Sequence, residues 1–112
     1  MKTDYSFAEN VYDVVRLIPF GRVTSYGAIA AYLGAKTGAR LVGYAMNNSH
    51  QVIPTVPAHR VVNRNGLLTG KHFFSTDFTM QQRLEAEGLT IENDCIVDFK
   101  KVFWDPAIEC IL

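Results

Sequence analysis

The sequence predicts a small, mainly helical domain of the winged-helix-like helix-turn-helix class, with one small β-hairpin. Two short helical segments, residues 26–33 and 37–47, are joined by a link that contains a glycine, and this spacing is typical of a helix-turn-helix. A hairpin turn signal follows at residues 63–66. The 112 residues are 48% hydrophobic, which is enough for one core, so we expect a single domain over residues 1–112.

The first helix is predicted over residues 7–17. Ser6 and Glu9 have the spacing of a capping box, and Pro19 ends the helix because proline lacks a backbone donor. Apolar residues recur along this segment at helical intervals, at Phe7, Val11, Val14 and Ile18.

The helix-turn-helix is predicted to begin at Thr24 and Ser25, a pair that can cap the helix of residues 26–33, and Gly34 is a natural stop for that helix. The following helix contains several small residues. They would let it enter a DNA groove closely or pack tightly on its neighbours, and the pattern alone leaves both interpretations open. Its predicted apolar side comprises Leu41, Val42, Ala45 and Met46.

The second half of the chain is predicted to hold short strands and one more helix. Its β-branched and glycine-flanked runs are typical of such strands. The expected features are a strand at 60–62, a return strand from Leu67 and Leu68, core packing of Phe73 and Phe74, a helix at 80–87 that stops at Gly88, and a hairpin within 91–102.

The charge of the chain is balanced overall but unevenly distributed. Acidic and basic residues number 11 each, yet residues 14–76 contain no aspartate or glutamate. An acid-free span of this length is typical of phosphate binding and favours a nucleic-acid partner. Its positive residues are Arg16, Arg22, Lys36, Arg40, Arg60, Arg64 and Lys71.

No segment approaches the roughly 20 apolar residues of a membrane span, so we expect no membrane partner and a cytoplasmic location, nucleoid-associated if the source is bacterial. Cys95 and Cys110 lack the spacing of a metal site or a redox motif, and we expect free structural thiols. No cofactor and no metal are expected, and the protein is expected to be a monomer.

The most informative stretch is residues 56–63, Val-Pro-Ala-His-Arg-Val-Val-Asn. A histidine and an arginine bracketed by apolar residues are costly to bury unless both find partners. The segment is therefore expected to hold a site. Ala58, beside the histidine, has no functional group.

Four motifs resemble the C-terminal domain of the DNA repair alkyltransferases that act on guanine alkylated at oxygen 6. They are Pro-Phe-Gly-Arg-Val-Thr-Ser-Tyr-Gly at 19–27, Ala-Arg-x-Val-Gly-x-Ala-Met at 39–46, Val-Pro-x-His-Arg-Val-Val at 56–62 and Arg-Leu-x-x-Glu-Gly at 83–88. They occur in the family's order with similar spacing. The resemblance spans about residues 5–104, nearly the whole chain.

The sequence departs from the active enzymes at Ala58, where the resemblance implies the cysteine that accepts the alkyl group. A methyl side chain is not a nucleophile, so alkyl transfer is not expected. The separate N-terminal domain of many of those enzymes is also absent from this sequence. Both features resemble the alkyltransferase-like proteins, which implies a non-enzymatic protein that binds duplex DNA through its minor groove, flips O(6)-alkylguanine out, and signals to nucleotide excision repair proteins.

The resemblance also implies roles for individual residues. Arg40 corresponds to the arginine finger that fills the gap left by the flipped base, and Tyr26 to the tyrosine that pushes the 3′ phosphate. His59 and Glu87 correspond to a proton relay that has nothing to activate here, so we expect them to be a hydrogen-bonded remnant pair. The expected DNA contacts are Thr24, Ser25, Tyr26, Lys36, Arg40 and Asn47, and the expected lesion pocket is Tyr26, Val56, Pro57, Ala58, His59, Asn63 and Lys71.

Four further expectations concern residues near the pocket or on the recognition helix. Arg60 is expected in a buried or half-buried ion pair, and Asn63 to cap the turn after the strand. Lys71 stands where the lesion-binding subfamily often has an arginine, and lysine stacks less well on a base. Tyr44 replaces the usual small residue of the recognition helix.

Two alternatives remain open from the sequence. The chain is compatible with a Cys-to-Ala variant of a methylated-DNA-protein cysteine methyltransferase. It is also compatible with a DNA-binding regulator that uses the same scaffold without any preference for lesions.

Overall fold

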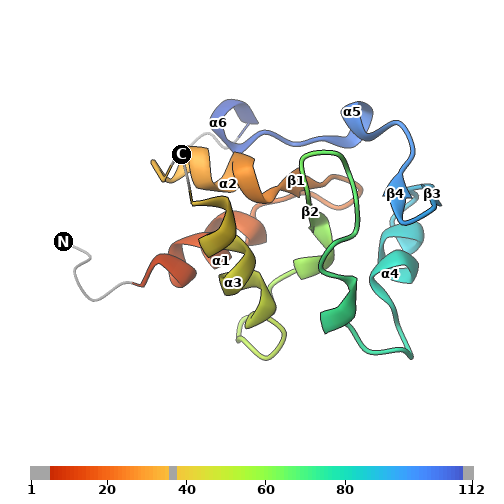
Figure 1. Cartoon of the computed structure of the whole chain (residues 1–112), viewed down its shortest axis with the longest axis horizontal. Coiled ribbons are helices and arrows are strands. Elements are labelled where there is room, and N and C mark those ends of the chain that lie inside the picture. The colour runs from red at the N-terminus through yellow and green to blue at the C-terminus, as the bar shows by residue number, and fades with distance from the viewer. Residues whose placement is uncertain (1–5, 36–37, 110–112) are drawn as a thin grey trace.

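A computed structural model describes residues 6–35 and 38–109 (Figure 1). The described elements are mostly helical, as predicted. In chain order they are α1 (Phe7–Arg16), β1 (Thr24–Ser25), α2 (Tyr26–Tyr32), α3 (Ala39–Asn47), a 3₁₀ turn (Ala58–Arg60), β2 (Val61–Val62), a second 3₁₀ turn (Lys71–Phe73), α4 (Met80–Ala86), β3 (Ile91–Glu92), β4 (Cys95–Ile96), α5 (Phe99–Val102) and α6 (Pro106–Glu109).

The predicted caps and stops of the helices are present. The Ser6 hydroxyl accepts a hydrogen bond from the Glu9 amide at the start of α1, and the Ser25 hydroxyl accepts one from the Ala28 amide at the start of α2. Gly34 ends α2 with a φ of +78°, a conformation that favours glycine. The helix predicted over 80–87 is α4, which a full capping box at Thr79 begins.

Helix α3 packs on both α1 and α2 and forms a helix-turn-helix with α2. Val42, Ala45 and Met46 are buried, as predicted. Leu41 was also predicted on this apolar side, and that prediction is wrong, because its side chain is 55% exposed on the outer side of the helix. The predicted start at residue 37 lies outside the described residues.

The strands pair differently from the predicted hairpin. β2 pairs in parallel with β1, with Thr24 opposite Val61. The turn at 63–66 forms, and the Gly66 amide donates to the Asn63 carbonyl at 2.9 Å. The return strand is not formed, because Leu67 pairs with Cys95 by an isolated bridge instead of extending along β2. Arg60 belongs to the 3₁₀ turn and not to the strand.

The hairpin predicted within 91–102 is confirmed as β3 and β4, which pair antiparallel. Helices α1, α2 and α3 lie on one side of the short β1–β2 pair and α4 lies with β3 and β4 on the other (Figure 1). Each side has its own core. The first is built on Val15, Ile29, Val42 and Trp104, and the second on Val23, Leu68, Leu84 and Ile96.

The predicted core packing of the Phe73–Phe74 pair is half correct. Phe74 packs against both cores, whereas Phe73 is 50% exposed. Within 6–35 and 38–109, no helix is long and apolar enough to cross a membrane. The same residues contain no group of three or more histidine, cysteine or acidic side chains arranged to hold a metal ion.

Candidate nucleic-acid interface

The outer face of α3 presents polar and aromatic side chains at helical spacing. Arg40 and Tyr44 are exposed and Asn47 follows one turn later, half-buried. No carboxylate among the described residues lies within ion-pair distance of Arg40. Gly43 lies between Arg40 and Tyr44 in the sequence, with nothing within 4 Å of the position that a side chain would occupy. The outer face of α3 therefore carries an exposed cation without a carboxylate partner in the described part of the chain, an exposed tyrosine and a glycine with open space at its Cα.

A small cavity lies between the start of α2 and the 3₁₀ turn that holds Ala58. Its volume is about 10 Å³, close to the smallest space that holds one water molecule. Tyr26 and Ala58, both predicted pocket residues, line it. The other lining residues are Met46, Asn47, His50, Val61, Gly70, Phe74 and Met80.

Two contacts at this cavity keep it small. A Cβ placed on Gly70 would lie 3.1 Å from the Tyr26 hydroxyl, so the loop backbone and the tyrosine are already close. The His50 ring meets Phe74 edge to face, with centroids 4.6 Å apart. Burial, and then the charge of Arg83, hold the pKa of His50 below its ordinary value. A nucleobase fits beside Ala58 only after these side chains move.

The carboxylate of Glu87 gathers three hydrogen-bond donors behind the Ala58 turn. His59 Nε2 lies 2.6 Å from Glu87 Oε2, and the Gly21 amide donates to Oε1 at 2.7 Å. Arg60 Nη2 donates to Oε2 at 2.8 Å, and its Nη1 donates to the Ile18 carbonyl at 2.9 Å. The Glu87 side chain is only 6% exposed. The expected His59–Glu87 contact and the half-buried ion pair of Arg60 are therefore both present.

The pKa values of this cluster follow from burial and from its hydrogen bonds. Burial lowers the pKa of the His59 imidazole, although the hydrogen bond to Glu87 opposes that shift. Burial raises the pKa of Glu87, but the hydrogen bonds from Arg60, Gly21 and His59 outweigh it, and the net pKa lies below the ordinary value. At neutral pH the cluster is a neutral imidazole donating to a carboxylate that Arg60 neutralises.

Other residues of the predicted pocket lie around the cavity without lining it. Val56 is buried in the first core. Asn63 Oδ1 accepts hydrogen bonds from the amides of Asn65 and Leu67, each at 2.9 Å, so it caps the turn as predicted. Lys71 is tied to Asp94 by an ion pair at the surface. Pro57 and His59, the remaining predicted pocket residues, do not line the cavity either.

Two of the predicted DNA contacts, Thr24 and Ser25 in β1, are buried in this structure. Thr24 is fully buried, and its hydroxyl is a buried polar atom without a hydrogen-bond partner among the described residues. Ser25 is 5% exposed and its hydroxyl caps α2. Both are held there because β1 pairs with β2. Lys36 lies outside the described residues.

Several cavity residues were not predicted from the sequence. The apolar periodicity of α3 places Met46 inward, so helical spacing offered a signal for that residue. His50, Gly70 and Phe74 belong to irregular loops, where no periodicity applies. These three residues line the cavity because their loops fold back toward Tyr26.

The acid-free span is largely neutralised in the fold. Four of its cations pair with carboxylates, all from outside the span, and two described cations of the span, Arg40 and Arg64, have no such partner. The sequence pattern thus overstated the positive charge that is free to meet phosphate. The pairs are Arg16–Asp13, Arg22–Glu109, Arg60–Glu87 and Lys71–Asp94.

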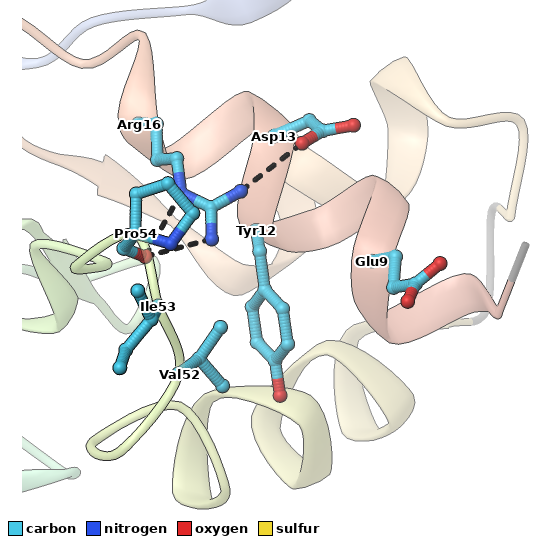
Figure 2. Close-up of a pocket in the computed structure, with 7 residues that line it drawn as sticks. All are labelled: Glu9, Tyr12, Asp13, Arg16, Val52, Ile53 and Pro54. Atoms are coloured by element: carbon cyan, nitrogen blue, oxygen red, sulfur yellow. Dashed lines mark hydrogen bonds and ion pairs between the residues drawn. The ribbon is translucent and has the colours of Figure 1, made fainter.

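Arg16 shows what such a paired cation does (Figure 2). Its guanidinium donates to the Pro54 carbonyl through Nη2 at 2.8 Å and through Nε at 3.3 Å, while Asp13 accepts from Nη1 at 3.1 Å. Pro54 follows Ile53, which is 90% exposed. Arg16 therefore fastens the loop that leads into the Ala58 turn to helix α1, and it is not free for DNA.

The helix-turn-helix carries on its second helix an arginine without a carboxylate partner among the described residues, and Tyr26 and Ala58 line a cavity. This combination is typical of a DNA-binding domain. Residues 6–89 match the family described as "6-O-methylguanine DNA methyltransferase, DNA binding domain". The chain belongs to this family.

Two curated relatives extend over most of the chain. Alkyltransferase-like protein 1 of Schizosaccharomyces pombe is 36% identical over 104 residues, which are 89% of this chain and 95% of the relative. The DNA base-flipping protein of Escherichia coli is 34% identical over 106 residues, covering 94% of this chain and 79% of the relative. The methyltransferase of Salmonella typhimurium is 47% identical over 64 residues, only 37% of its length.

The fold also agrees with solved structures of similar proteins. The crystal structure of S. pombe Atl1 with damaged DNA containing O6-carboxymethylguanine matches 95% of this chain and all of that chain, with a TM-score of 0.77 and 36% identity. A structure of the Mycobacterium tuberculosis methyltransferase with DNA matches 74% of this chain and 50% of that chain, with a TM-score of 0.57 and 34% identity. The predicted fold class and family resemblance are therefore confirmed.

Proposed function

We propose that this protein binds duplex DNA through its minor groove, flips O(6)-alkylguanine into the space beside Ala58, and performs no chemistry on it. The similarity to a protein solved with a damaged duplex supports the choice of ligand. The observation that carries the proposal is the wall of the cavity. Ala58 contributes a methyl group where alkyl transfer needs a thiolate.

Two features support base flipping. Extruding a base costs a few kcal/mol, and a planar cation stacked in the gap offsets that cost. Arg40 is exposed on α3 and free of carboxylates, so it can serve as this finger. Tyr26 lies at the cavity wall at the start of α2, where it can press on the phosphate beside the rotated nucleotide.

The bound base displaces the contacts that close the cavity. We infer that the loop around Gly70 moves away from Tyr26 and that the His50–Phe74 contact opens. Without a bulky side chain at residue 58, the opened pocket has room for an alkyl group of variable size. Lys71 is held by Asp94 at the edge of this loop and can reach the base only if that ion pair breaks.

The first test compares affinity for two duplexes that differ only in one O(6)-methylguanine, at several stated salt concentrations. We expect the lesion duplex to bind at least about tenfold more tightly, which is a difference of about 1.4 kcal/mol. Fluorescence anisotropy with each labelled duplex measures both affinities. Equal affinities would instead identify a DNA-binding regulator with no lesion preference.

The alternative, that this chain is a Cys-to-Ala variant of a methylated-DNA-protein cysteine methyltransferase with its acceptor position at residue 58, is favoured by one observation. The His59–Glu87 pair that would activate a thiol is in hydrogen-bond contact. We expect Ala58→Cys to take up a methyl group from O(6)-methylguanine DNA slowly but measurably by mass spectrometry. Ala58→Ser, whose hydroxyl is a far weaker nucleophile at neutral pH, is the matched control. Sequencing the natural gene shows whether alanine is native.

We further propose that the DNA complex is read by proteins of nucleotide excision repair and that the protein acts as a monomer. A protein that binds a lesion without removing it contributes to repair only if another factor recognises the complex. Pulldown of excision-repair proteins on lesion DNA, with and without this protein, tests that step. Sedimentation of the DNA complex tests the stoichiometry.

A further inference from the structure

A second surface of the protein has the features of a DNA-backbone site. It is a groove of about 430 Å³ whose lining is mostly apolar, between the 63–66 turn and helix α5. Phe99 and Phe103 lie in it, with their rings edge to face at 5.5 Å. Arg64 from the turn and Lys100 from the helix provide its two positive charges.

Both of these cations are unpaired. Among the described residues, no carboxylate lies within ion-pair distance of Arg64 or Lys100, whereas most other cations of the described chain are paired or stacked. The neighbouring Lys101 differs, because its ammonium lies 4.0 Å from Asp98 Oδ2 and it does not line the groove. Two uncompensated charges on one groove call for an anionic partner.

The groove is held in shape by contacts across its base. A Cβ added to Gly66 would lie 3.0 Å from Phe99 Cγ, so the turn that holds Arg64 packs directly on the aromatic ring of α5. The Ile96 amide also donates to the Gly66 carbonyl at 3.0 Å. The two cations are therefore presented from elements that are fixed against each other, which lowers the entropy cost of binding.

The groove adjoins the proposed base pocket. Ser25 lines the groove and Tyr26, the next residue, lines the cavity beside Ala58. A DNA strand whose nucleotide is rotated past Tyr26 must continue along the surface on one side of it. The groove offers apolar ring faces for deoxyribose and two cations for phosphates, and protein–DNA contacts go mainly to these two parts of the backbone.

We propose that the sugar–phosphate backbone beside the flipped nucleotide crosses this groove, with Arg64 and Lys100 contacting its phosphates. Lys100 and the two phenylalanines lie beyond the segment that matches the family's DNA-binding domain, which ends at residue 89. The C-terminal segment thereby becomes part of the DNA-binding surface. This inference rests on the proposed mode of DNA binding, but it does not depend on the lesion.

The test measures how affinity for plain duplex DNA depends on salt, for the full chain and its variants. Each phosphate contact contributes about 0.9 to the slope of log affinity against log salt. We expect Lys100→Ala and Arg64→Ala each to reduce the slope by about 0.9, and the double variant by about twice that. Lys100→Arg should keep the wild-type slope. Lys101→Ala, one residue away on the same helix, is the matched control and should leave it unchanged.

The proposal is overturned if Lys100→Ala has the same slope as Lys101→Ala, even if Arg64→Ala weakens binding, because α5 would then lie off the DNA. Thermal melting of each variant checks that the fold persists. We expect it to persist, because the side chains of Arg64, Lys100 and Lys101 are polar and exposed. Lesion preference is a ratio of affinities at one salt concentration, so its loss and the loss of the slope effect are separate results.

Discussion

Replacing Arg40 with alanine is expected to remove most of the preference for lesion DNA and to leave the fold intact. If its guanidinium offsets about 2 kcal/mol of the cost of extruding a base, affinity for the O(6)-methylguanine duplex falls about 30-fold. Affinity for plain duplex falls much less, because only one cation is removed. Paired anisotropy titrations on the two duplexes measure the difference.

Two controls separate the roles of Arg40. Arg40→Lys keeps the charge but lacks the planar group that stacks in the vacated gap, so it should retain plain-duplex affinity and lose lesion preference. Because the side chain is exposed, the free energy of unfolding of Arg40→Ala should change by less than about 0.5 kcal/mol. A large fall in melting temperature would show that Arg40 is structural.

The largest effect on stability is expected at Glu87. Its side chain accepts hydrogen bonds from His59, Arg60 and Gly21 and is almost fully buried. Glu87→Ala leaves a half-buried guanidinium without its carboxylate, and breaking such a pair costs about 3–5 kcal/mol. For a domain of this size we expect the melting temperature to fall by more than about 10 °C.

Glu85→Ala is the matched control for Glu87→Ala. Glu85 lies in the last turn of α4, near Glu87 in the sequence, but it is exposed and accepts one hydrogen bond from Gln81. Its replacement should change the free energy of unfolding by less than about 0.5 kcal/mol. If both variants melt alike, the buried cluster contributes nothing beyond helix α4 itself.

The same cluster makes stability depend on pH with a defined sign. The pKa of Glu87 is lowered in the fold from an ordinary value of 4.5, so its contribution is complete above that pH and is lost on acidification. The pKa of His59 is lowered in the fold from 6.5. As the pH falls below that value, the His59 imidazole is therefore protonated more readily in the unfolded chain than in the folded one, which favours unfolding. Melting temperature should therefore decline below about pH 6.5, and Glu87→Gln should flatten the decline at its acid end.

The helices were predictable because their signals are local. Ser6, Ser25, Gly34 and Gly88 act within a few residues of the helices they bound. The strand pairing was not predictable in the same way. β2 joins β1 through the pairing of Thr24 with Val61, two residues far apart in the sequence, and this pairing depends on how the helices between them pack.

The site was predictable only where a motif fixes it. The burial of His59 and Arg60 demanded partners, the family resemblance paired Glu87 with His59, and the fold brings the three residues together. The local sequence does not indicate whether a side chain is exposed to solvent. Thr24 was therefore expected to face DNA, although it is fully buried. The closure of the cavity by His50 and Phe74 arises from loops with no repeating pattern.

The neutralised cations are expected to limit how long the protein stays on undamaged DNA. Sequence-independent binding comes almost entirely from phosphate contacts, so a protein that makes few of them stays only briefly at any one site. Because Arg16, Arg22, Arg60 and Lys71 are occupied by carboxylates, the protein is held on ordinary sequence mainly by the few described cations without such a partner, among them Arg40, Arg64 and Lys100. It is expected to leave normal base pairs quickly and to remain only where a base enters the cavity. Its selectivity for lesions is therefore expected to be expressed mainly as a difference in dissociation rate.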